Sequence, residues 1–244
     1  MRLVYIGIDD TDNLETRGTG FRARQLIERL QECRLGEGIG VTRHQLLFDE
    51  RVPYTSHNSA ACLVVSSHSE IVQLADCCRE FLLEIAAPGS DVGLCISEEQ
   101  QASWVSDFGS RAQTDVVSQQ DAHSLARQYG ILLEGLTGDH QGIIGALSAV
   151  GLHASGNDGR YIWGRGLRDY DNQTLAMGVL KANTNIDRVT LLNGVEVADE
   201  HALIDLGSWP RTVRINRQAV LLVEKLCGGK YKVLDKAVIK SAYP

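Results

Sequence analysis

The chain has 244 residues, of which 43% are hydrophobic and 23% are charged, and its formal net charge is −7. This composition is typical of a globular protein with one large core or two smaller ones. It argues against a chain that is basic as a whole, although a local basic surface remains compatible with the total. No apolar stretch approaches the roughly 18 to 20 residues that span a bilayer, and no leader precedes the first strand, so we expect a cytoplasmic protein that does not contact membranes.

The first predicted unit is a strand, an acidic loop and a helix. Residues 3–8 form an apolar run typical of a buried strand, and the apolar positions of residues 21–33 repeat at helical spacing. Three carboxylates, those of Asp9, Asp10 and Asp12, follow the strand. Such a cluster repels itself unless a cation offsets its charge, and Mg²⁺ often binds one or two carboxylates together with substrate phosphates. We therefore predict that these three residues form the catalytic centre and bind the metal.

The acidic cluster has a simpler explanation, because Asp and Thr are also good turn and N-cap residues. Three acids within four residues exceed what one cap needs. They are followed by Arg17, Gly18, Thr19 and Gly20, which lie at the entry to the predicted helix. Backbone N–H groups at a helix start commonly hold phosphate oxygens. We therefore predict that these four residues contact a nucleotide, and we keep helix capping as the alternative.

The middle of the chain alternates between strand and helix patterns. Strands are expected at residues 41–48, 60–66, 92–96 and 131–136, and helices at residues 71–85, 121–129 and 143–150. A polar loop over residues 49–59 contains Asn58 and Ser59, whose amide and hydroxyl groups suit contacts with a base, ribose or phosphate. An ordinary solvated loop explains these two residues equally well.

A second glycine-containing loop precedes the helix expected at residues 143–150. It includes Asp139, His140 and Gly142, and Gly145 follows within the helix. A histidine in such a loop could position a phosphate or transfer a proton near neutral pH. A tight turn with close helix packing is an equally good explanation. We predict nucleotide contacts here because the acidic cluster would need a partner of this kind.

The sequence changes character towards its C-terminus, and we predict a boundary that separates residues 1–170 from residues 171–244. The second part is rich in short strands, at residues 189–192, 195–198, 211–216, 220–223 and 231–234. Asn193-Gly194 is a strong hairpin signal between the first two of them. Before the boundary, arginines alternate with aromatic residues from Arg160 to Tyr170, a mixture suited to bases and phosphates, although an ordinary strand surface explains it at least as well.

Four motifs occur in a specific order along residues 1–170. They are Gly7-Ile8-Asp9-Asp10-Thr11-Asp12, Arg17-Gly18, Pro53-Tyr54 with Asn58, and the glycine-containing segment from Gly142 to Gly151. In this order they resemble the amino-terminal half of the tRNA(Ile) 2-agmatinylcytidine synthetase family. The resemblance implies an ATP-dependent, kinase-like domain that activates the C2 oxygen of a cytosine for displacement by agmatine. It also implies that the three aspartates hold Mg²⁺ and the ATP phosphates, beside the loop around Gly142.

The chain departs from that family in two ways. After Arg17-Gly18 the family carries a Cys-Thr-Thr-Tyr stretch with a phosphorylated threonine, whereas this chain has Phe21 at the matching position. The family also continues into a ferredoxin-like domain, an OB-fold and a zinc ribbon that grip tRNA. This sequence ends at Pro244, and its six cysteines lack zinc-ligand spacing. A reduced ferredoxin-like module is one interpretation of residues 171–244.

Together these observations predict an α/β protein with a mixed sheet, a kinase-like domain that binds ATP and Mg²⁺, and a small strand-rich C-terminal module. The predicted activity is phosphoryl transfer that activates a nucleobase or small molecule, with RNA as a candidate acceptor. A hypothesis from another class is a non-catalytic module that senses a nucleotide or binds RNA. The sequence makes no prediction about the oligomeric state.

Overall fold

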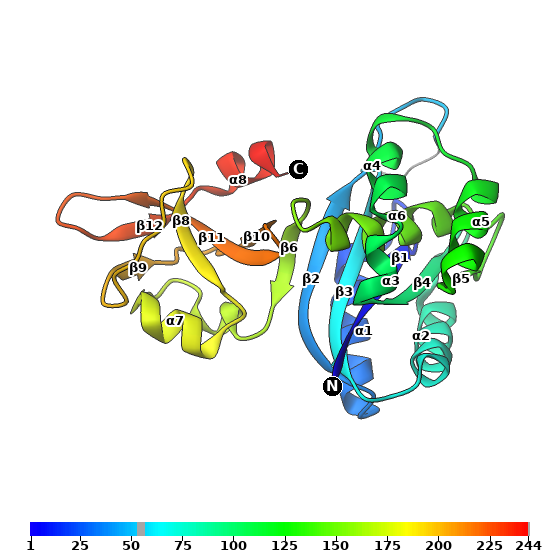
Figure 1. Ribbon diagram of the computed structural model, residues 1–244, viewed down its shortest axis with the longest axis horizontal. Coiled ribbons are helices and arrows are strands. Elements are labelled where there is room, and N and C mark those ends of the chain that lie inside the picture. Colours follow the sequence, from blue (N-terminus) through cyan, green and yellow to red (C-terminus); the bar gives the residue numbers. More distant parts are fainter. Residues whose placement is uncertain (53–56, 244) are drawn as a thin grey trace. The chain divides into compact units, whose positions relative to one another are not determined.

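The structure is a computed structural model that describes residues 1–52 and 57–243 (Figure 1). It divides into two compact units, Met1–Ser155 and Gly156–Pro244. The division falls earlier than the boundary predicted at residue 170, because Arg160 pairs with Val213 and so joins its segment to the second unit. None of the helices in the described ranges is long and apolar enough to cross a membrane.

The first unit contains every strand and helix expected for it, with bounds that differ by a few residues. Its elements are β1 (Arg2–Asp9), α1 (Thr19–Glu32), β2 (Glu37–Gln45), β3 (Ser59–Ser67), α2 (Ile71–Ile85), β4 (Gly93–Glu98), α3 (Glu99–Ser103), α4 (Ser106–Thr114), α5 (Gln119–Tyr129), β5 (Leu132–Gly135) and α6 (Gly142–Ser155). The sequence did not predict α3 and α4. Both helices are short, but Ala102, Val105, Phe108 and Ala112 recur at helical spacing and are buried in the core, so an apolar period was present in the sequence.

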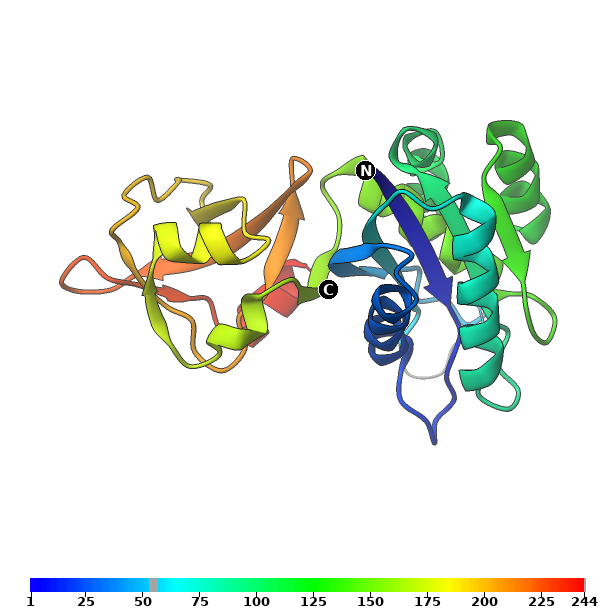
Figure 2. The same cartoon turned by 90° about the horizontal axis from the view of Figure 1, so that it is seen from below.

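The strands of this unit form an antiparallel sheet in the order β5-β4-β1-β3-β2. Helices α1 and α2 pack against each other on one face, and α6 covers the other face together with α3, α4 and α5 (Figures 1 and 2). The central strand β1 is therefore covered on both faces. This explains why residues 4–8 are all buried and apolar instead of alternating with polar residues.

Helix α6 packs against the sheet at unusually close range. Side chains alternate between the two faces of a strand, so Tyr5, Gly7 and Asp9 of β1 share one face, and Tyr5 packs in the core cluster that includes α6. A Cβ atom added at Gly7 would overlap the carbonyl oxygen of Ala146, and one added at Gly93 would overlap the backbone of Gly142. Glycine at these positions thus allows the helix backbone to rest directly on β1 and β4.

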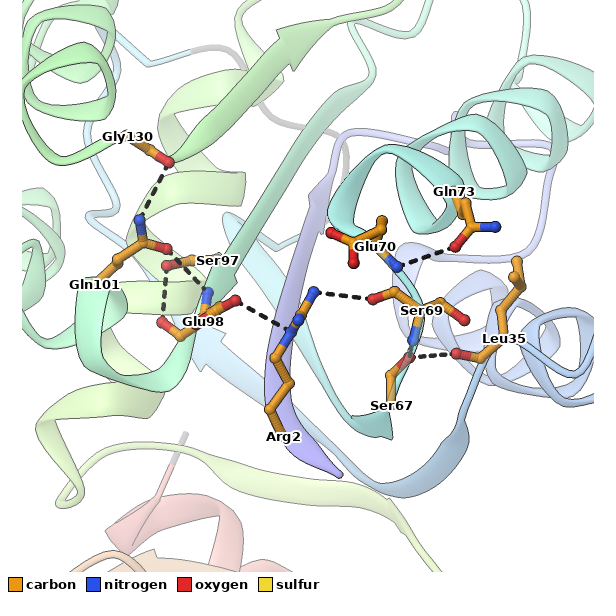
Figure 3. Close-up of polar contacts among 10 residues, drawn as sticks. All are labelled: Arg2, Leu35, Ser67, Ser69, Glu70, Gln73, Ser97, Glu98, Gln101 and Gly130. Atoms are coloured by element: carbon orange, nitrogen blue, oxygen red, sulfur yellow. Dashed lines mark hydrogen bonds and ion pairs between the residues drawn. The ribbon is translucent and has the colours of Figure 1, made fainter.

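Polar contacts hold the opposite end of β1, where the chain begins. The Arg2 guanidinium donates to the carbonyl oxygen of Ser69 at 2.9 Å and pairs with the Glu98 carboxylate at 3.1 Å. Figure 3 shows these contacts beside the starts of α2 and α3. There the backbone N–H groups of Glu70 and Glu98 donate to glutamine side chains three residues further along the chain, at 3.0 and 3.4 Å. These hydrogen bonds and the ion pair fix the start of β1 to the segments that begin α2 and α3.

The second unit is strand-rich, as predicted, and has its own core. Its elements are β6 (Arg160–Gly164), the 3-10 helix η1 (Leu167–Tyr170), β7 (Thr174–Ala176), α7 (Met177–Asn183), β8 (Arg188–Leu191), β9 (Leu203–Asp205), β10 (Thr212–Ile215), β11 (Gln218–Lys225), β12 (Tyr231–Val233) and α8 (Lys236–Ala242). The strands follow the order β6-β10-β11-β12-β9-β7, and β8 pairs in parallel with β11. Because both parallel and antiparallel pairs occur in the chain, the mixed α/β fold is confirmed.

The predicted hairpin around Asn193-Gly194 is present only in part. The second strand, expected at residues 195–198, is short: one bridge joins Thr190 to Glu196, and the N–H groups of Leu191 and Val197 donate to the carbonyls of Val195 and Val189 at 2.8 and 2.9 Å. On its other edge β8 pairs with β11, with Thr190 opposite Leu222. A strand can pair along both of its edges, so the local hairpin and the tertiary pairing with β11 coexist.

Replacing Gly7 with alanine should destabilise the first unit. The added methyl group would force α6 away from β1, and overpacking of this kind typically lowers the free energy of unfolding by about 1–3 kcal/mol. Urea unfolding measures this loss. The control is Gly178→Ala in α7, where the nearest atom to an added Cβ is the Glu200 Cβ at 3.4 Å, so stability should be unchanged or slightly higher. Equal stability of Gly7→Ala and the unaltered protein would contradict the close packing.

Candidate active site

The carboxylate of Asp9 lies against the backbone of α6. Strand alternation directs its side chain to the face that α6 covers, where a Cβ added at Gly145 would overlap the carboxylate oxygen Oδ2. The residue is half-buried, with its carboxylate packed against the backbone of α6. Burial, and next the charge of Asp10, raise the pKa of Asp9 from 3.8 to about 7. A buried acid with this pKa is a strong candidate for a functional group.

Asp10 connects the acidic loop to the start of β4. Its backbone adopts a left-handed conformation with φ of 51°, and its Oδ2 accepts a hydrogen bond from the backbone N–H of Asp91 at 3.1 Å. Burial raises the pKa of Asp10, and the carboxylates of Asp91 and Asp12 raise it further. Two neighbouring carboxyl groups, those of Asp9 and Asp10, therefore resist ionisation in the absence of a cation.

Asp91 joins three loops, and the sequence analysis did not identify it. Its carboxylate accepts a hydrogen bond from the N–H of Asp139 at 2.7 Å, and its carbonyl accepts one from the N–H of Gly142 at 2.9 Å. Because β4 runs antiparallel to β1, with Gly93 opposite Asp9, the residues before β4 meet those after β1. The available signal was an acid just before a predicted strand. That signal becomes informative only when the two strands are known to be antiparallel neighbours.

Asp12 caps helix α1. Its Oδ1 accepts hydrogen bonds from the N–H of Thr19 at 2.9 Å and from the Thr19 hydroxyl at 2.7 Å. The buried hydroxyl of Thr11 donates to the same Thr19 oxygen at 3.1 Å. Helix capping, the alternative considered for the acidic cluster, therefore accounts for one oxygen of Asp12. A role for its second oxygen in metal binding stays a prediction.

The start of α1 brings Gly18, Thr19 and Gly20 to the acidic loop through the Asp12 cap. Several backbone N–H groups there already have acceptors, since those of Phe21 and Arg22 donate to the Gly18 carbonyl. Positive charge comes instead from side chains.

Three guanidinium groups surround the Phe21 ring. Those of Arg17, Arg22 and Arg24 lie 5.1, 5.9 and 5.4 Å from its centroid. Arg17 is exposed and the other two are half-buried. Arginine pairs well with phosphate oxygens, and an aromatic ring can stack on a base. The start of α1 therefore combines positive charge with an aromatic surface beside the acidic loop.

Asn58 and Ser59 lie at the same edge of the sheet, because β3 is antiparallel to β1. The Asn58 side-chain amide donates to the Leu47 carbonyl at 2.7 Å, and Ser59 pairs with Gln45. These contacts close the connection between β2 and β3, so the Asn58 amide is engaged in structure. Pro53 and Tyr54, which belong to the family motif, lie outside the described residues.

The loop with Asp139 and His140 presents its backbone to Asp91. Asp139 and His140 are exposed. The His140 side chain lies against Gly135 of β5, and its backbone is left-handed with φ of 63°. Gly142 and Gly145 contact Asp91 and Asp9 directly. The structure therefore brings the two glycines into the acidic site more closely than it does the histidine ring.

The acidic site fits a metal ion that arrives with phosphates better than an ion held by protein alone. Within residues 1–52 and 57–243, no three His, Cys, Asp or Glu side chains are arranged around one metal position. Mg²⁺ usually takes one or two carboxylates and completes its shell with phosphates and water. Asp9 and Asp10 match this requirement, since a cation would stabilise the ionised form of two carboxyl groups whose pKa is raised by burial and by neighbouring carboxylates.

Comparisons with known proteins confirm the family resemblance. No protein-family model matches the chain. The chain is 30% identical over 152 residues to the tRNA(Ile) 2-agmatinylcytidine synthetase TiaS of Archaeoglobus fulgidus, a match that covers 61% of this chain and 35% of that protein. Its homologues in sequence and structure are thus agmatinylcytidine synthetases, and it spans about a third of the length of the relatives it matches.

Two solved structures of such relatives are similar in fold. The complex of TiaS with an isoleucine tRNA and ATP matches with 30% identity and a TM-score of 0.56, over 62% of this chain and 36% of that one. The complex of TiaS with the same tRNA, AMPCPP and agmatine matches with 29% identity and a TM-score of 0.54, over 62% and 36% of the two chains.

Asp12→Ala should lower the free energy of unfolding by about 1 kcal/mol, because it removes the acceptor for the Thr19 N–H group. Asp12→Asn keeps an acceptor oxygen and should retain most of the stability. Urea unfolding of both variants separates the contribution of the capping hydrogen bond to stability from that of the negative charge. An equal loss of stability in the two variants would contradict the capping geometry.

The stability of the metal-free protein should depend on the protonation of Asp9. Its pKa is about 7 in the folded state against an ordinary value of 3.8, so between these values the folded state holds a proton that the unfolded state has released. The stabilisation is complete below pH 3.8 and is lost as the pH rises through about 7, by up to about 4 kcal/mol.

The neutral variant Asp9→Asn removes this dependence. The difference in unfolding free energy between Asp9→Asn and the unaltered protein should therefore grow in favour of the variant from pH 4 to pH 8. A difference that does not change with pH would show that the Asp9 pKa is ordinary.

Proposed function

We propose that this chain, a homologue of the tRNA(Ile) 2-agmatinylcytidine synthetases over about three fifths of its length, binds ATP with Mg²⁺ at the end of β1. We further propose that it transfers a phosphoryl group from ATP to a cytidine in RNA or to a smaller acceptor. The proposal rests on two solved structures that are similar to this chain. Both are of TiaS bound to tRNA, one with ATP and one with AMPCPP. Cytoplasmic location stays a prediction that accompanies this role.

The residues of the site suit this chemistry. Phosphoryl transfer depends mainly on positioning and on neutralisation of negative charge. Asp9 and Asp10 would hold Mg²⁺, which neutralises phosphate charge when bound. The guanidinium groups of Arg17 and Arg22, beside the helix start that Asp12 caps, would pair with phosphate oxygens. The closely packed Gly145 keeps water away from the Asp9 carboxylate, which strengthens its interaction with a cation.

Phe21 removes one step of the family's reaction from this chain. Its side chain has no hydroxyl group, so it cannot carry the phosphoryl group that the resemblance assigns to a threonine at this position. We therefore propose that transfer occurs without a phosphorylated intermediate at this position. The same substitution favours a second candidate function, a module that binds the nucleotide and RNA without turnover.

Nucleotide binding should be measurable as a thermal shift. ATP with Mg²⁺ at 100 times its dissociation constant should add about 2.7 kcal/mol to the stability of the folded state. Asp9→Asn should abolish this gain, and Asp107→Asn, at an exposed position on α4, should keep it. An undiminished shift in Asp9→Asn would contradict the site.

Turnover separates the two candidate functions. The enzyme should release ADP from ATP and Mg²⁺ when an unmodified tRNA transcript is present, as followed by chromatography of the nucleotides. A thermal shift without any such product would favour the non-catalytic module.

A further inference from the structure

Positive charge is concentrated in the second unit. Residues 1–155 contain 11 arginines, no lysine and 21 acidic residues, a net charge of −10. Residues 156–244 contain 13 basic and 10 acidic residues, a net charge of +3, and they carry all six lysines of the chain. The two values add to the −7 of the whole chain. The overall acidity therefore conceals a basic unit, and a basic unit attracts polyanions.

Three cationic side chains of this unit converge on one indole ring. The guanidinium carbons of Arg160 and Arg211 lie 5.7 and 4.9 Å from the centroid of the Trp209 ring, and the Lys236 ammonium lies 5.5 Å from it. We call these four residues the Trp209 cluster. They come from the start of β6, the segment before β10 and the start of α8. Cation–π attraction to the ring offsets part of the repulsion among the three charges.

Arg160 is the buried member of the Trp209 cluster. Arg160 is 5% exposed, and one of its guanidinium nitrogens donates to the Tyr243 carbonyl at 3.2 Å. Its Nε atom has no hydrogen-bond partner in the described part of the chain. Burial lowers the pKa of Arg160. A buried cation without a carboxylate partner is unfavourable, and an anion bound nearby would reduce that penalty.

The outer members of the cluster are accessible. Lys236 is exposed, and Trp209 and Arg211 are half-buried. Arg211 also donates to the Pro210 carbonyl at 2.6 Å. Neither Arg160 nor Lys236 forms an ion pair with a carboxylate in residues 1–52 or 57–243. Guanidinium and ammonium groups around a partly exposed aromatic ring match a phosphate group with an adjoining base.

We propose that the Trp209 cluster is a binding site for the phosphodiester backbone of RNA. Phosphate oxygens would contact Arg211 and Lys236, and an unpaired base would stack on the accessible part of the Trp209 ring. The charge and geometry indicate a nucleic-acid polyanion, and the choice of RNA rests on the proposed function. The simpler alternative is that Arg160 only anchors the segment after α8 through the Tyr243 carbonyl.

The test is fluorescence anisotropy with a fluorescein-labelled tRNA transcript, without ATP, over a series of KCl concentrations. The double variant Arg211→Gln/Lys236→Gln removes two phosphate contacts. It should bind the transcript more weakly, and the slope of log affinity against log salt should become shallower by about 1.5. Trp209→Leu should weaken binding with little change in that slope, because stacking releases no counterions.

The matched control is Lys181→Gln/Lys225→Gln, which removes the same two charges at exposed positions outside the cluster. It should keep affinity and slope close to those of the unaltered protein. Urea unfolding of each variant confirms that it folds. Unchanged binding in the cluster variant, or an equal loss in the control, would overturn the proposal, as would equal competition by unlabelled double-stranded DNA.

Loss of the RNA site and loss of the ATP site give different results in these measurements. Asp9→Asn should lose the ATP-dependent thermal shift while it keeps tRNA affinity. The Arg211→Gln/Lys236→Gln variant should show the reverse. Failure of the unaltered protein to bind the transcript would overturn the RNA site, and the ATP measurement would still test the first unit separately.

Discussion

The direct contact between the backbone of α6 and the strands β1 and β4 sets the geometry of the whole candidate site. Ordinary helix packing keeps backbones apart by a layer of side chains. Here Gly7 and Gly93 remove that layer on the sheet, and Gly142 and Gly145 remove it on the helix. The end of β1 is consequently pressed against the first turn of α6. A carboxylate in this position loses part of its hydration.

That constraint explains why the acidic site has unusual electrostatics. Asp9 loses water because Gly145 lies over it, and Asp10 is held beside it by the N–H group of Asp91. Burial and the neighbouring carboxylates raise the pKa of both groups, so they resist ionisation in the absence of a cation. Asp12 differs, since its Oδ1 is engaged by the helix cap at Thr19. Three neighbouring acids in the sequence thus have different surroundings, and Asp9 and Asp10 are the two that we propose to hold a cation.

The two units differ in charge in a way that fits two kinds of anionic partner. The first unit is strongly acidic, so it would bind a nucleotide only through a cation and a few arginines placed near Phe21. The second unit is mildly basic and collects three cations at Trp209. Binding of a small triphosphate and of a long phosphodiester chain would therefore rely on separate groups of side chains.

Local sequence was enough to predict most strands and helices of the first unit, the acidic loop after β1 and the relation to the synthetase family. Those features depend on short-range periodicity and on residues close together in the chain. The sequence did not show which acidic side chains lie close together, because that depends on the packing of distant segments. Asp91 meets Asp10 because β4 is antiparallel to β1, and the convergence of Arg160, Arg211 and Lys236 on Trp209 joins residues far apart in the chain. Such contacts follow from strand order and packing, which no local pattern of residues encodes.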